Sequence, residues 1–159
     1  PPPDHHTLSL HDALPICQST LVRAYHHLGE KDKAIAALAM EFRIFNEREL
    51  ALALETAYAK GDYSGAILSV AQMLEERSKT IYLDPIWMGN MYKLAGEAEK
   101  AIDWYEVGFQ STGPNIPYLG ARIKSPGIPS NPRFIKLLRE MKLDYWADKY
   151  EKAGKAGSE

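Results

Sequence analysis

The residues of this chain that could most readily do chemistry lie at its amino terminus. The first sixteen residues read PPPDHHTLSLHDALPI and bring three histidines and two aspartates into nine positions. Imidazole nitrogens and carboxylate oxygens are the ligands that zinc and manganese prefer. Taken alone, the group formed by Asp4, His5, His6, His11 and Asp12 predicts a metal site.

Few residues after this segment suit catalysis or cofactor binding. His26 and His27 are adjacent, so on a helix they point in different directions and cannot share a metal as an i, i+4 pair does. Cys17 has no base beside it that would activate a thiol. The glycines are not followed by the Gly-Lys-Ser/Thr of a phosphate-binding loop. We therefore expect no catalytic residue, no resident metal and no cofactor in this part of the chain.

Composition points to one ordinary soluble domain. The chain has 159 residues, a formal net charge of −2 and 45% hydrophobic residues, which is typical of a globular protein. Its single cysteine cannot form an intramolecular disulfide, and this agrees with a reducing, cytoplasmic compartment. We expect no membrane span and no signal peptide. Nucleic-acid binding is not expected either, because a dense basic stripe with stacking aromatics is lacking.

A short motif occurs three times, as GEKDKAI, GDYSGAI and GEAEKAI. Its glycines lie 61 − 29 = 32 and 96 − 61 = 35 positions apart. From each Ala-Ile, apolar residues continue at i, i+3 and i+7, the spacing of one helix face. These residues are Ile35, Leu38 and Phe42, then Ile67, Val70 and Leu74, then Ile102, Tyr105 and Phe109. An apolar helix also precedes each glycine, so the pattern predicts three helix-turn-helix units.

Capping signals place the helix boundaries. Asn46 with Glu49 predicts a reciprocal cap that opens the first helix of the second unit. Asp84 before Pro85 predicts a cap and a first-turn proline for the third unit. Asn131 before Pro132 repeats that start. The expected helices in the three units span about residues 17–28, 31–45, 47–60, 63–78, 85–95 and 98–110.

These units resemble tetratricopeptide repeats, in which a glycine ends the first helix and a small alanine lets the second helix pack closely. The matching residues are Gly29, Gly61 and Gly96 at the turn, Ala34, Ala66 and Ala101 at the close-packing position, Tyr25 and Tyr92 at the aromatic position, and Gly89 at a small-residue position. Tyr58 lies one position nearer to its glycine than Tyr25 and Tyr92 do to theirs. Glu41, Met73 and Gly108 stand where the family usually has alanine. The resemblance implies an all-α solenoid that binds proteins and is not an enzyme.

The resemblance also implies a domain organisation. We expect an array over residues 17–113, with units at about 17–46, 47–80 and 84–113. A loop should follow at 114–131, then a capping helix region at 132–151 that covers the last repeat, and a flexible tail at 152–159. The segment from Asn131 to Phe134 resembles the tail of bacterial tetratricopeptide proteins, where the array is often the C-terminal part of a larger regulator.

The first helix of each unit should line the concave, partner-binding face of such an array. The residues expected there are Ser19, Arg23, His26, Glu55, Tyr58, Asn90 and Lys93. Of these, Arg23, Asn90 and Lys93 could hold a peptide carboxylate or an acidic segment. An ordinary hydrophilic groove without a particular ligand is the alternative.

The amino-terminal segment has a second explanation. Residues 7–16, TLSLHDALPI, resemble a translated short-read sequencing adapter, and the segment lacks a helical period. We therefore expect residues 1–16 to be non-native. Two other functions stay open. Asp4, His5 and His6 resemble the signature triplet of a phosphoesterase superfamily and could mark a fragment of a metal-dependent enzyme, or the chain could be an oligomerising or autoinhibitory segment of a signalling protein. We also expect the apolar side of the first helix to be uncovered, so that the chain is marginally stable or self-associates.

Overall fold

The computed structural model describes the backbone of residues 10–111, 116, 119–122 and 127–156, and the side chains of residues 19–111, 116, 119–120 and 127–154. All regular secondary structure in these ranges is helical, which confirms the all-α class. No helix among the described residues is long and apolar enough to span a bilayer. The chain divides into two compact units, Pro1–Val70 and Ala71–Glu159, and each is described by itself.

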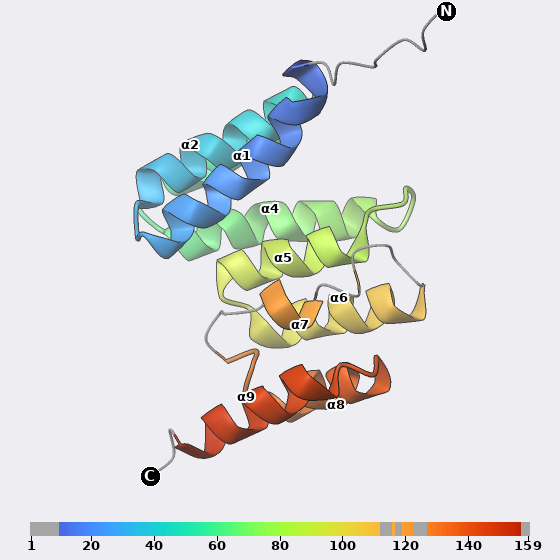
Figure 1. Ribbon diagram of the computed structural model, residues 1–159. Coiled ribbons are helices and arrows are strands. Elements are labelled where there is room, and N and C mark those ends of the chain that lie inside the picture. The colour runs from blue at the N-terminus through green and yellow to red at the C-terminus, as the bar shows by residue number, and fades with distance from the viewer. Residues whose placement is uncertain (1–9, 112–115, 117–118, 123–126, 157–159) are drawn as a thin grey trace, which may run out of the picture. The chain divides into compact units, whose positions relative to one another are not determined.

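The first unit contains α1 (Leu10–His27), α2 (Lys31–Ile44), α3 (Arg48–Tyr58) and the first half of α4 (Tyr63–Arg77). α2 packs against both α1 and α3, and α1 and α2 lie side by side in Figure 1. Because α2 has neighbours on two sides, seven of its residues are buried. They are Ala34, Ile35, Ala37, Leu38, Ala39, Glu41 and Phe42. Among the described side chains of α1, Val22 alone is buried.

The second unit contains the rest of α4, then α5 (Pro85–Ala95), α6 (Ala98–Gln110), α7 (Leu119–Arg122), α8 (Pro132–Glu140) and α9 (Asp144–Ala156). α5 packs against α6, α6 against α8, α8 against α9, and α9 against α7. The C-terminal helices therefore lie on the second helix of the predicted third unit.

Phe134 is the apolar centre of this C-terminal packing. It is fully buried, and its ring centroid lies 6.3 Å from that of Tyr105 on α6 and 6.3 Å from that of Tyr150 on α9. Tyr150 Oη donates a hydrogen bond of 2.7 Å to the carbonyl oxygen of Gly120 on α7. One aromatic cluster thus joins four helices of the second unit.

Two of the predicted turns have the same backbone geometry. Gly29 and Gly96 are left-handed, with φ of 73° and 89°. At both turns, the glycine N–H and the N–H of the following glutamate bond back to the preceding helix at 3.1 and 2.9 Å, as in a Schellman motif. Glu30 (φ −78°, ψ 68°) and Glu97 (φ −87°, ψ 76°) then adopt inverse γ-turns. The next helix starts at once, so the two helices of each pair are held antiparallel.

The three alanines expected to allow close helix packing are buried. Ala34, Ala66 and Ala101 are 1%, 1% and 0% exposed. The turn at Gly61 (φ 87°) differs from those at Gly29 and Gly96. Here Asp62 follows the glycine, and its Oδ1 accepts a 3.0 Å hydrogen bond from the backbone N–H of Gly65 on α4.

Two of the three predicted N-caps are confirmed. Asp84 Oδ1 accepts a hydrogen bond of 2.8 Å from the backbone N–H of Ile86. Asn131 Oδ1 accepts one of 2.9 Å from the backbone N–H of Arg133. In both helices a proline follows the cap, where its missing N–H removes no helical bond.

The predicted cap at Asn46 is wrong. Asn46 has a φ of 62° and donates its N–H to the carbonyl of Arg43 at 3.1 Å, while Glu47 donates to Phe42 at 2.7 Å. Asn46 therefore ends α2 in a Schellman motif, as the glycines end α1 and α5. The physical reason is that asparagine tolerates the left-handed region better than other residues with a side chain. Glu47 is the N-cap of α3, and its side chain makes no capping bond.

The first helix begins at Leu10 rather than near residue 17. α1 contains Pro15 in its second turn, where a proline removes one backbone hydrogen bond. Of the segment expected to be non-native, residues 1–9 lie outside the described part of the chain. Residues 10–16 belong to the backbone of α1.

The predicted capping region at 132–151 is two helices rather than a single continuous one. Lys142 takes a φ of 61°, and its N–H and that of Leu143 bond to the carbonyls of Arg139 and Leu138, both at 2.9 Å. This Schellman motif ends α8 and lets α9 turn back onto it. α9 continues to Ala156, so the tail expected from residue 152 is helical over its first residues.

The predicted loop at 114–131 contains the short helix α7, and some of its described residues belong to the core. Ile116, Leu119 and Ile128 are 8%, 2% and 1% exposed. Other residues of this stretch lie outside the described residues.

Candidate functional site

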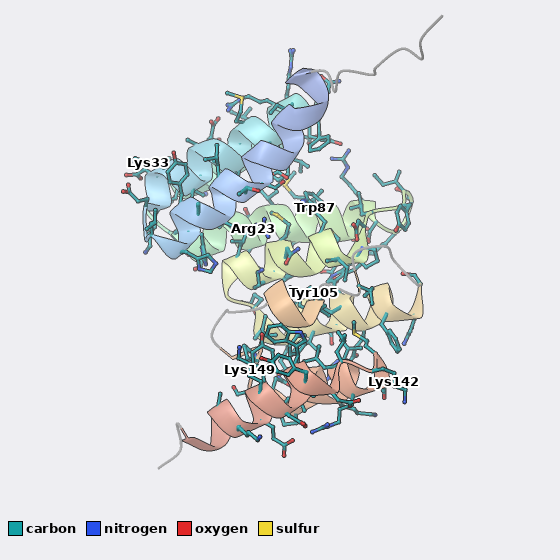
Figure 2. The ribbon with its side chains drawn as sticks, viewed as in Figure 1. Arg23, Lys33, Trp87, Tyr105, Lys142 and Lys149 are labelled. Atoms are coloured by element: carbon teal, nitrogen blue, oxygen red, sulfur yellow. The ribbon has the colours of Figure 1, made fainter. Side chains whose placement is uncertain are left out.

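The residues expected to bind a partner lie on α1 and α3 in the first unit and on α5 in the second. Most of them already contact other side chains of their own unit. The exception is Arg23, which is exposed and makes no ion pair within the described residues. Figure 2 labels it on α1.

Ser19 is directed into the α1–α2 hairpin. Its hydroxyl donates a hydrogen bond of 2.7 Å to Glu41 Oε1, and Glu41 is only 4% exposed. A buried carboxylate requires such a donor, because an ionised group without one is costly to desolvate. Ser19 thus gives the buried Glu41 carboxylate a hydrogen-bond donor on α1.

His26 belongs to a polar and aromatic cluster at which the ends of four helices meet. His26 Nδ1 lies 3.0 Å from Tyr63 Oη, and the two rings stack with centroids 5.9 Å apart. Tyr58 lies edge-on to Tyr63 at 6.3 Å, and its hydroxyl donates 2.6 Å to Asp32 Oδ1. Lys31 Nζ lies 5.8 Å from the Tyr63 ring centroid.

The electrostatics of this cluster keep both tyrosines protonated. Burial, and to a smaller degree the neighbouring Tyr58, raises the pKa of Tyr63 to about 12. The hydrogen bond to Asp32 raises the pKa of Tyr58 above its usual value. The hydroxyls are therefore hydrogen-bond donors at neutral pH, and the cluster holds helix ends together rather than supplying a nucleophile.

Glu55 is also held by α2. Arg43 Nη2 donates to both carboxylate oxygens of Glu55, at 2.8 and 2.7 Å. Both side chains are partly exposed, at 44% and 40%, so water screens the pair. The structure therefore directs Glu55 and Tyr58 toward α2, and neither is displayed to a partner as Arg23 is.

In the second unit, Asn90 and Lys93 lie next to each other on α5. Lys93 Nζ donates a hydrogen bond of 3.0 Å to Asn90 Oδ1, and the buried Tyr105 hydroxyl donates one of 3.2 Å to the same oxygen. Burial raises the pKa of Tyr105, so its hydroxyl stays a donor. Asn90 is half-buried and joins α5 to α6.

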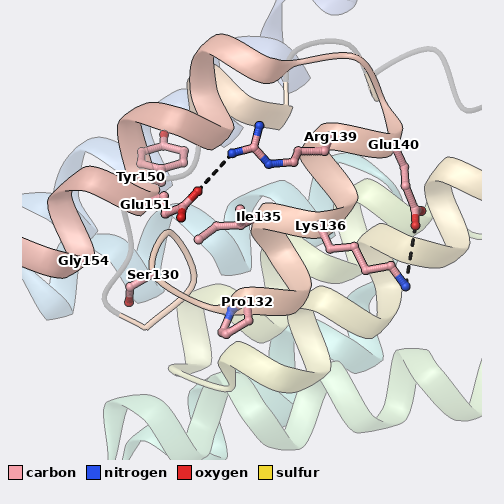
Figure 3. A pocket seen from close by; sticks show the side chains of 9 residues that line it. All are labelled: Ser130, Pro132, Ile135, Lys136, Arg139, Glu140, Tyr150, Glu151 and Gly154. Carbon is pink, nitrogen blue, oxygen red and sulfur yellow. Dashed lines mark hydrogen bonds and ion pairs between the residues drawn. The ribbon is translucent and has the colours of Figure 1, made fainter.

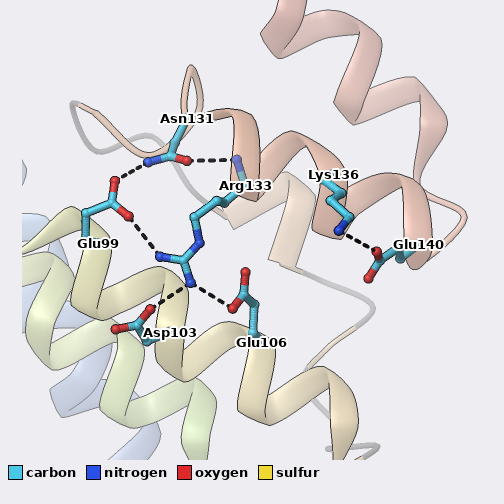
Figure 4. Close-up of polar contacts among 7 residues, drawn as sticks. All are labelled: Glu99, Asp103, Glu106, Asn131, Arg133, Lys136 and Glu140. Atoms are coloured by element: carbon cyan, nitrogen blue, oxygen red, sulfur yellow. Dashed lines mark hydrogen bonds and ion pairs between the residues drawn. The ribbon is translucent and has the colours of Figure 1, made fainter.

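Arg133 on α8 forms a cluster of ion pairs with α6 that was not predicted from the sequence. Arg133 donates to Glu99, Asp103 and Glu106 at 2.9, 2.7 and 2.8 Å, as Figure 4 shows. These hydrogen bonds raise the pKa of the guanidinium, which therefore stays charged. The three carboxylates are spaced i, i+4 and i+7 on α6, and that spacing could have indicated a shared cation.

Arg139 forms a similar set of ion pairs between α8 and α9. Arg139 Nη2 donates to Asp148 at 2.9 Å and to Glu151 at 3.0 Å, and Asp144 lies 3.7 Å from Nη1. α8 thus carries one arginine toward each of its neighbouring helices.

A groove of about 600 Å³ runs between α8 and α9. Figure 3 shows Ile135 pointing between the helices and the pair of Arg139 and Glu151 spanning them. The charges that line the groove are largely compensated within it, because Lys136 also lies 3.7 Å from Glu140. The lining residues are Ser130, Pro132, Ile135, Lys136, Arg139, Glu140, Tyr150, Glu151 and Gly154.

Within the described residues, no group of three or more His, Cys, Asp or Glu side chains could hold a metal ion. The N-terminal cluster remains untested, because Asp4, His5 and His6 lie outside those residues, as do the side chains of His11 and Asp12.

Comparison with known proteins gives no relative: no protein-family model, no curated protein and no solved structure matches this chain.

Proposed function

We propose that this chain is an array of tetratricopeptide-like helix pairs that binds a segment of another protein. The observation that carries the proposal is the identical turn at Gly29–Glu30 and Gly96–Glu97, which are 96 − 29 = 67 residues apart, close to two 34-residue periods. Burial of an alanine five residues after each of the three glycines supports the same interpretation. Helix pairs of this kind bury a continuous core only by stacking on their neighbours.

The C-terminal helices support the proposal of a terminal cap. α8 covers α6 through the buried Phe134 and through Arg133. A stack of repeats needs such an element because its last helix would otherwise expose an apolar face to water. On the resemblance of the segment around Arg133, we infer that the chain is the C-terminal region of a larger bacterial regulator that works in the cytoplasm.

The mechanism is recognition without bond chemistry, and we infer that the partner segment is acidic. In the first unit Arg23 is an exposed cation on α1 that other described residues leave unpaired. A guanidinium holds a carboxylate through two charge-assisted hydrogen bonds. In the second unit, Lys93 with Asn90 offers an ammonium group beside an amide. No cofactor or metal is required for this function.

The test begins with peptides selected against the chain from a random display library, whose affinities are measured by fluorescence anisotropy. Arg23→Glu should weaken the binding of an acidic peptide at least tenfold, because it replaces attraction by repulsion. Lys152→Glu is the matched control, since it makes the same charge change at an exposed position of α9 and should leave affinity unchanged. If no peptide is selected, or both variants bind as the wild type does, the proposal fails.

A further inference from the structure

Two histidines lie next to Arg23 on the surface of α1. His26 and His27 follow Arg23 by three and four residues, which places them about 60° to one side of it and about 40° to the other around the helix. Side chains at these spacings are neighbours, with Cβ atoms about 5–6 Å apart. Because α1 ends at His27, the three side chains form one basic group near the end of this helix.

The two histidines differ in what they contact. His26 is half-buried, its Nδ1 lies 3.0 Å from Tyr63 Oη, and its ring stacks on that of Tyr63. His27 is exposed, and its ring meets only the edge-on ring of His26, with centroids 5.7 Å apart. Within the described residues the His27 side chain makes no hydrogen bond or ion pair. It therefore faces water beside Arg23.

The acidic side chains that follow most closely in the sequence are already engaged. Glu30, in the turn after α1, forms an ion pair of 3.0 Å with Lys33. Asp32, in the first turn of α2, accepts a hydrogen bond of 2.6 Å from the Tyr58 hydroxyl. The backbone carbonyls of the last turn of α1 also have partners, because they accept hydrogen bonds from the turn that follows. These groups do not take up the charge of Arg23 or of a protonated histidine.

The elements packed near the end of α1 bring cations and neutral groups to it. Lys31 on α2 lies with its Nζ 5.8 Å from the ring centroid of Tyr63 on α4. Burial raises the pKa of Tyr63 to about 12, and the hydrogen bond to Asp32 raises the pKa of Tyr58 on α3, so both tyrosines are uncharged at neutral pH. A proton on His27 therefore finds no free carboxylate among the described residues of its unit.

Histidine differs from the other charged side chains because it ordinarily gains its charge between about pH 5 and 8. The protonated ring donates from both nitrogens, and a charge-assisted hydrogen bond to a carboxylate is stronger than a neutral one. A carboxylate bound to Arg23 can receive such a bond from His27, one helical turn away, only while that histidine is protonated. Binding of the proton and binding of the carboxylate then favour each other.

We propose that Arg23 and His27 together hold a carboxylate of the acidic partner segment, so that the protein binds this segment more tightly in mildly acidic solution than at pH 8. The inference rests on the function proposed above and adds a second binding residue and a regulation to it. Affinity is highest where His27 is charged and falls as the pH rises and the charge is lost. His26, which was predicted to line the site, instead contacts α4 through Tyr63.

Fluorescence anisotropy of the full chain tests the inference, with a labelled, acetylated acidic peptide that contains no histidine and is selected as described above. Its carboxylates stay ionised at both about pH 5.5 and about pH 8. The wild type should bind the peptide about three- to fivefold more tightly at the lower pH, the contribution of one exposed ion pair. His27→Gln should bind equally at both pH values, with the affinity of the wild type at pH 8. His27→Arg should also bind equally at both, with the affinity of the wild type at the lower pH.

His27→Gln leaves the other histidines in place and so controls for them. A wild-type affinity that is the same at both pH values overturns the inference, and so does a pH dependence that persists in His27→Gln. Where the peptide binds and Arg23→Glu weakens its binding, these outcomes leave the proposed function standing. Failure to select any peptide overturns both proposals. Circular dichroism of each variant at both pH values verifies that the helices are retained.

Discussion

The ring of Tyr105 fills the space beside Gly89. A Cβ built on Gly89 would lie 2.3 Å from Cε1 and 2.6 Å from Cδ1 of that ring, and 3.0 Å from the carbonyl oxygen of Ala101. Tyr105 is fully buried, and its hydroxyl donates a hydrogen bond to Asn90. The ring therefore cannot move aside without losing its packing and this hydrogen bond. The close approach of α5 and α6 therefore depends on the absence of a side chain at residue 89.

Gly89→Ala should lower the free energy of unfolding by about 1–3 kcal/mol, the usual cost of overpacking a core, although alanine favours helix more than glycine does. Gly154→Ala is the control, because its Cβ would make an ordinary 3.5 Å contact with Ser130 and should raise stability by up to about 1 kcal/mol. Urea denaturation followed by circular dichroism measures both. A Gly89→Ala variant as stable as the wild type would show that the two helices pack differently.

The left-handed conformation of Asn46 gives a second prediction. Asn46→Gly should keep the free energy of unfolding within about 0.5 kcal/mol, since glycine adopts positive φ without strain. Asn46→Thr should cost about 1–2 kcal/mol, because a β-branched residue is strained at positive φ whereas asparagine tolerates it. If Asn46 were instead the N-cap of α3, threonine would serve nearly as well as asparagine. A neutral Asn46→Thr change would therefore restore the capping interpretation.

The comparison of Asn46 with Asp84 shows what the sequence could predict. Both residues looked like caps, and Asp84 is one, because Pro85 after it cannot continue a preceding helix and fits the first position of a new one. Asn46 has no such neighbour, and the choice between ending α2 and opening α3 depends on the hydrogen bonds of both helices. The break at Lys142 was missed for a similar reason, since apolar spacing continues through it and no glycine marks it. The buried alanines were predictable because their role depends on size and period alone.

The partner-binding residues were less predictable than the repeats. Placing Arg23 on an exposed side of α1 required only the helical period. The engagement of Glu55 by Arg43, and of Tyr58 by Asp32, depends on which turns of α2 and α3 adjoin. The packing of the whole unit decides which turns of two helices face each other. No local pattern in a single sequence predicts that alignment.

Arg133 should stabilise the second unit through its three carboxylates. Arg133→Gln leaves Glu99, Asp103 and Glu106 close together without a cation, so the urea midpoint should fall. The fall should be smaller in 1 M salt, where exposed charges are screened. Lys136→Gln, which removes a 79% exposed lysine from the same helix, is the control and should have little effect. Equal effects of the two substitutions at low salt would contradict the role given to Arg133.

Glu75 should make stability depend on pH in acid. It accepts hydrogen bonds from the Tyr92 hydroxyl and from Lys100 Nζ. Partial burial opposes ionisation of this carboxyl, but these two hydrogen bonds and the charge of Lys100 outweigh it, so the pKa of Glu75 lies below its usual value.

Because the folded pKa is the lower one, the stabilisation is complete above the unfolded value of about 4.3 and is lost as the pH falls through the folded pKa. Tyr92→Phe removes one of the two donors, which brings the folded pKa closer to the unfolded one. The variant should therefore be less stable than the wild type at pH 7, and the difference between them should shrink by pH 3. Urea denaturation at both pH values measures this. Tyr145→Phe, at a 70% exposed tyrosine of α9, is the control, and a Tyr92→Phe deficit that is the same at pH 3 as at pH 7 would show that the tyrosine stabilises the fold by packing rather than through the Glu75 carboxylate.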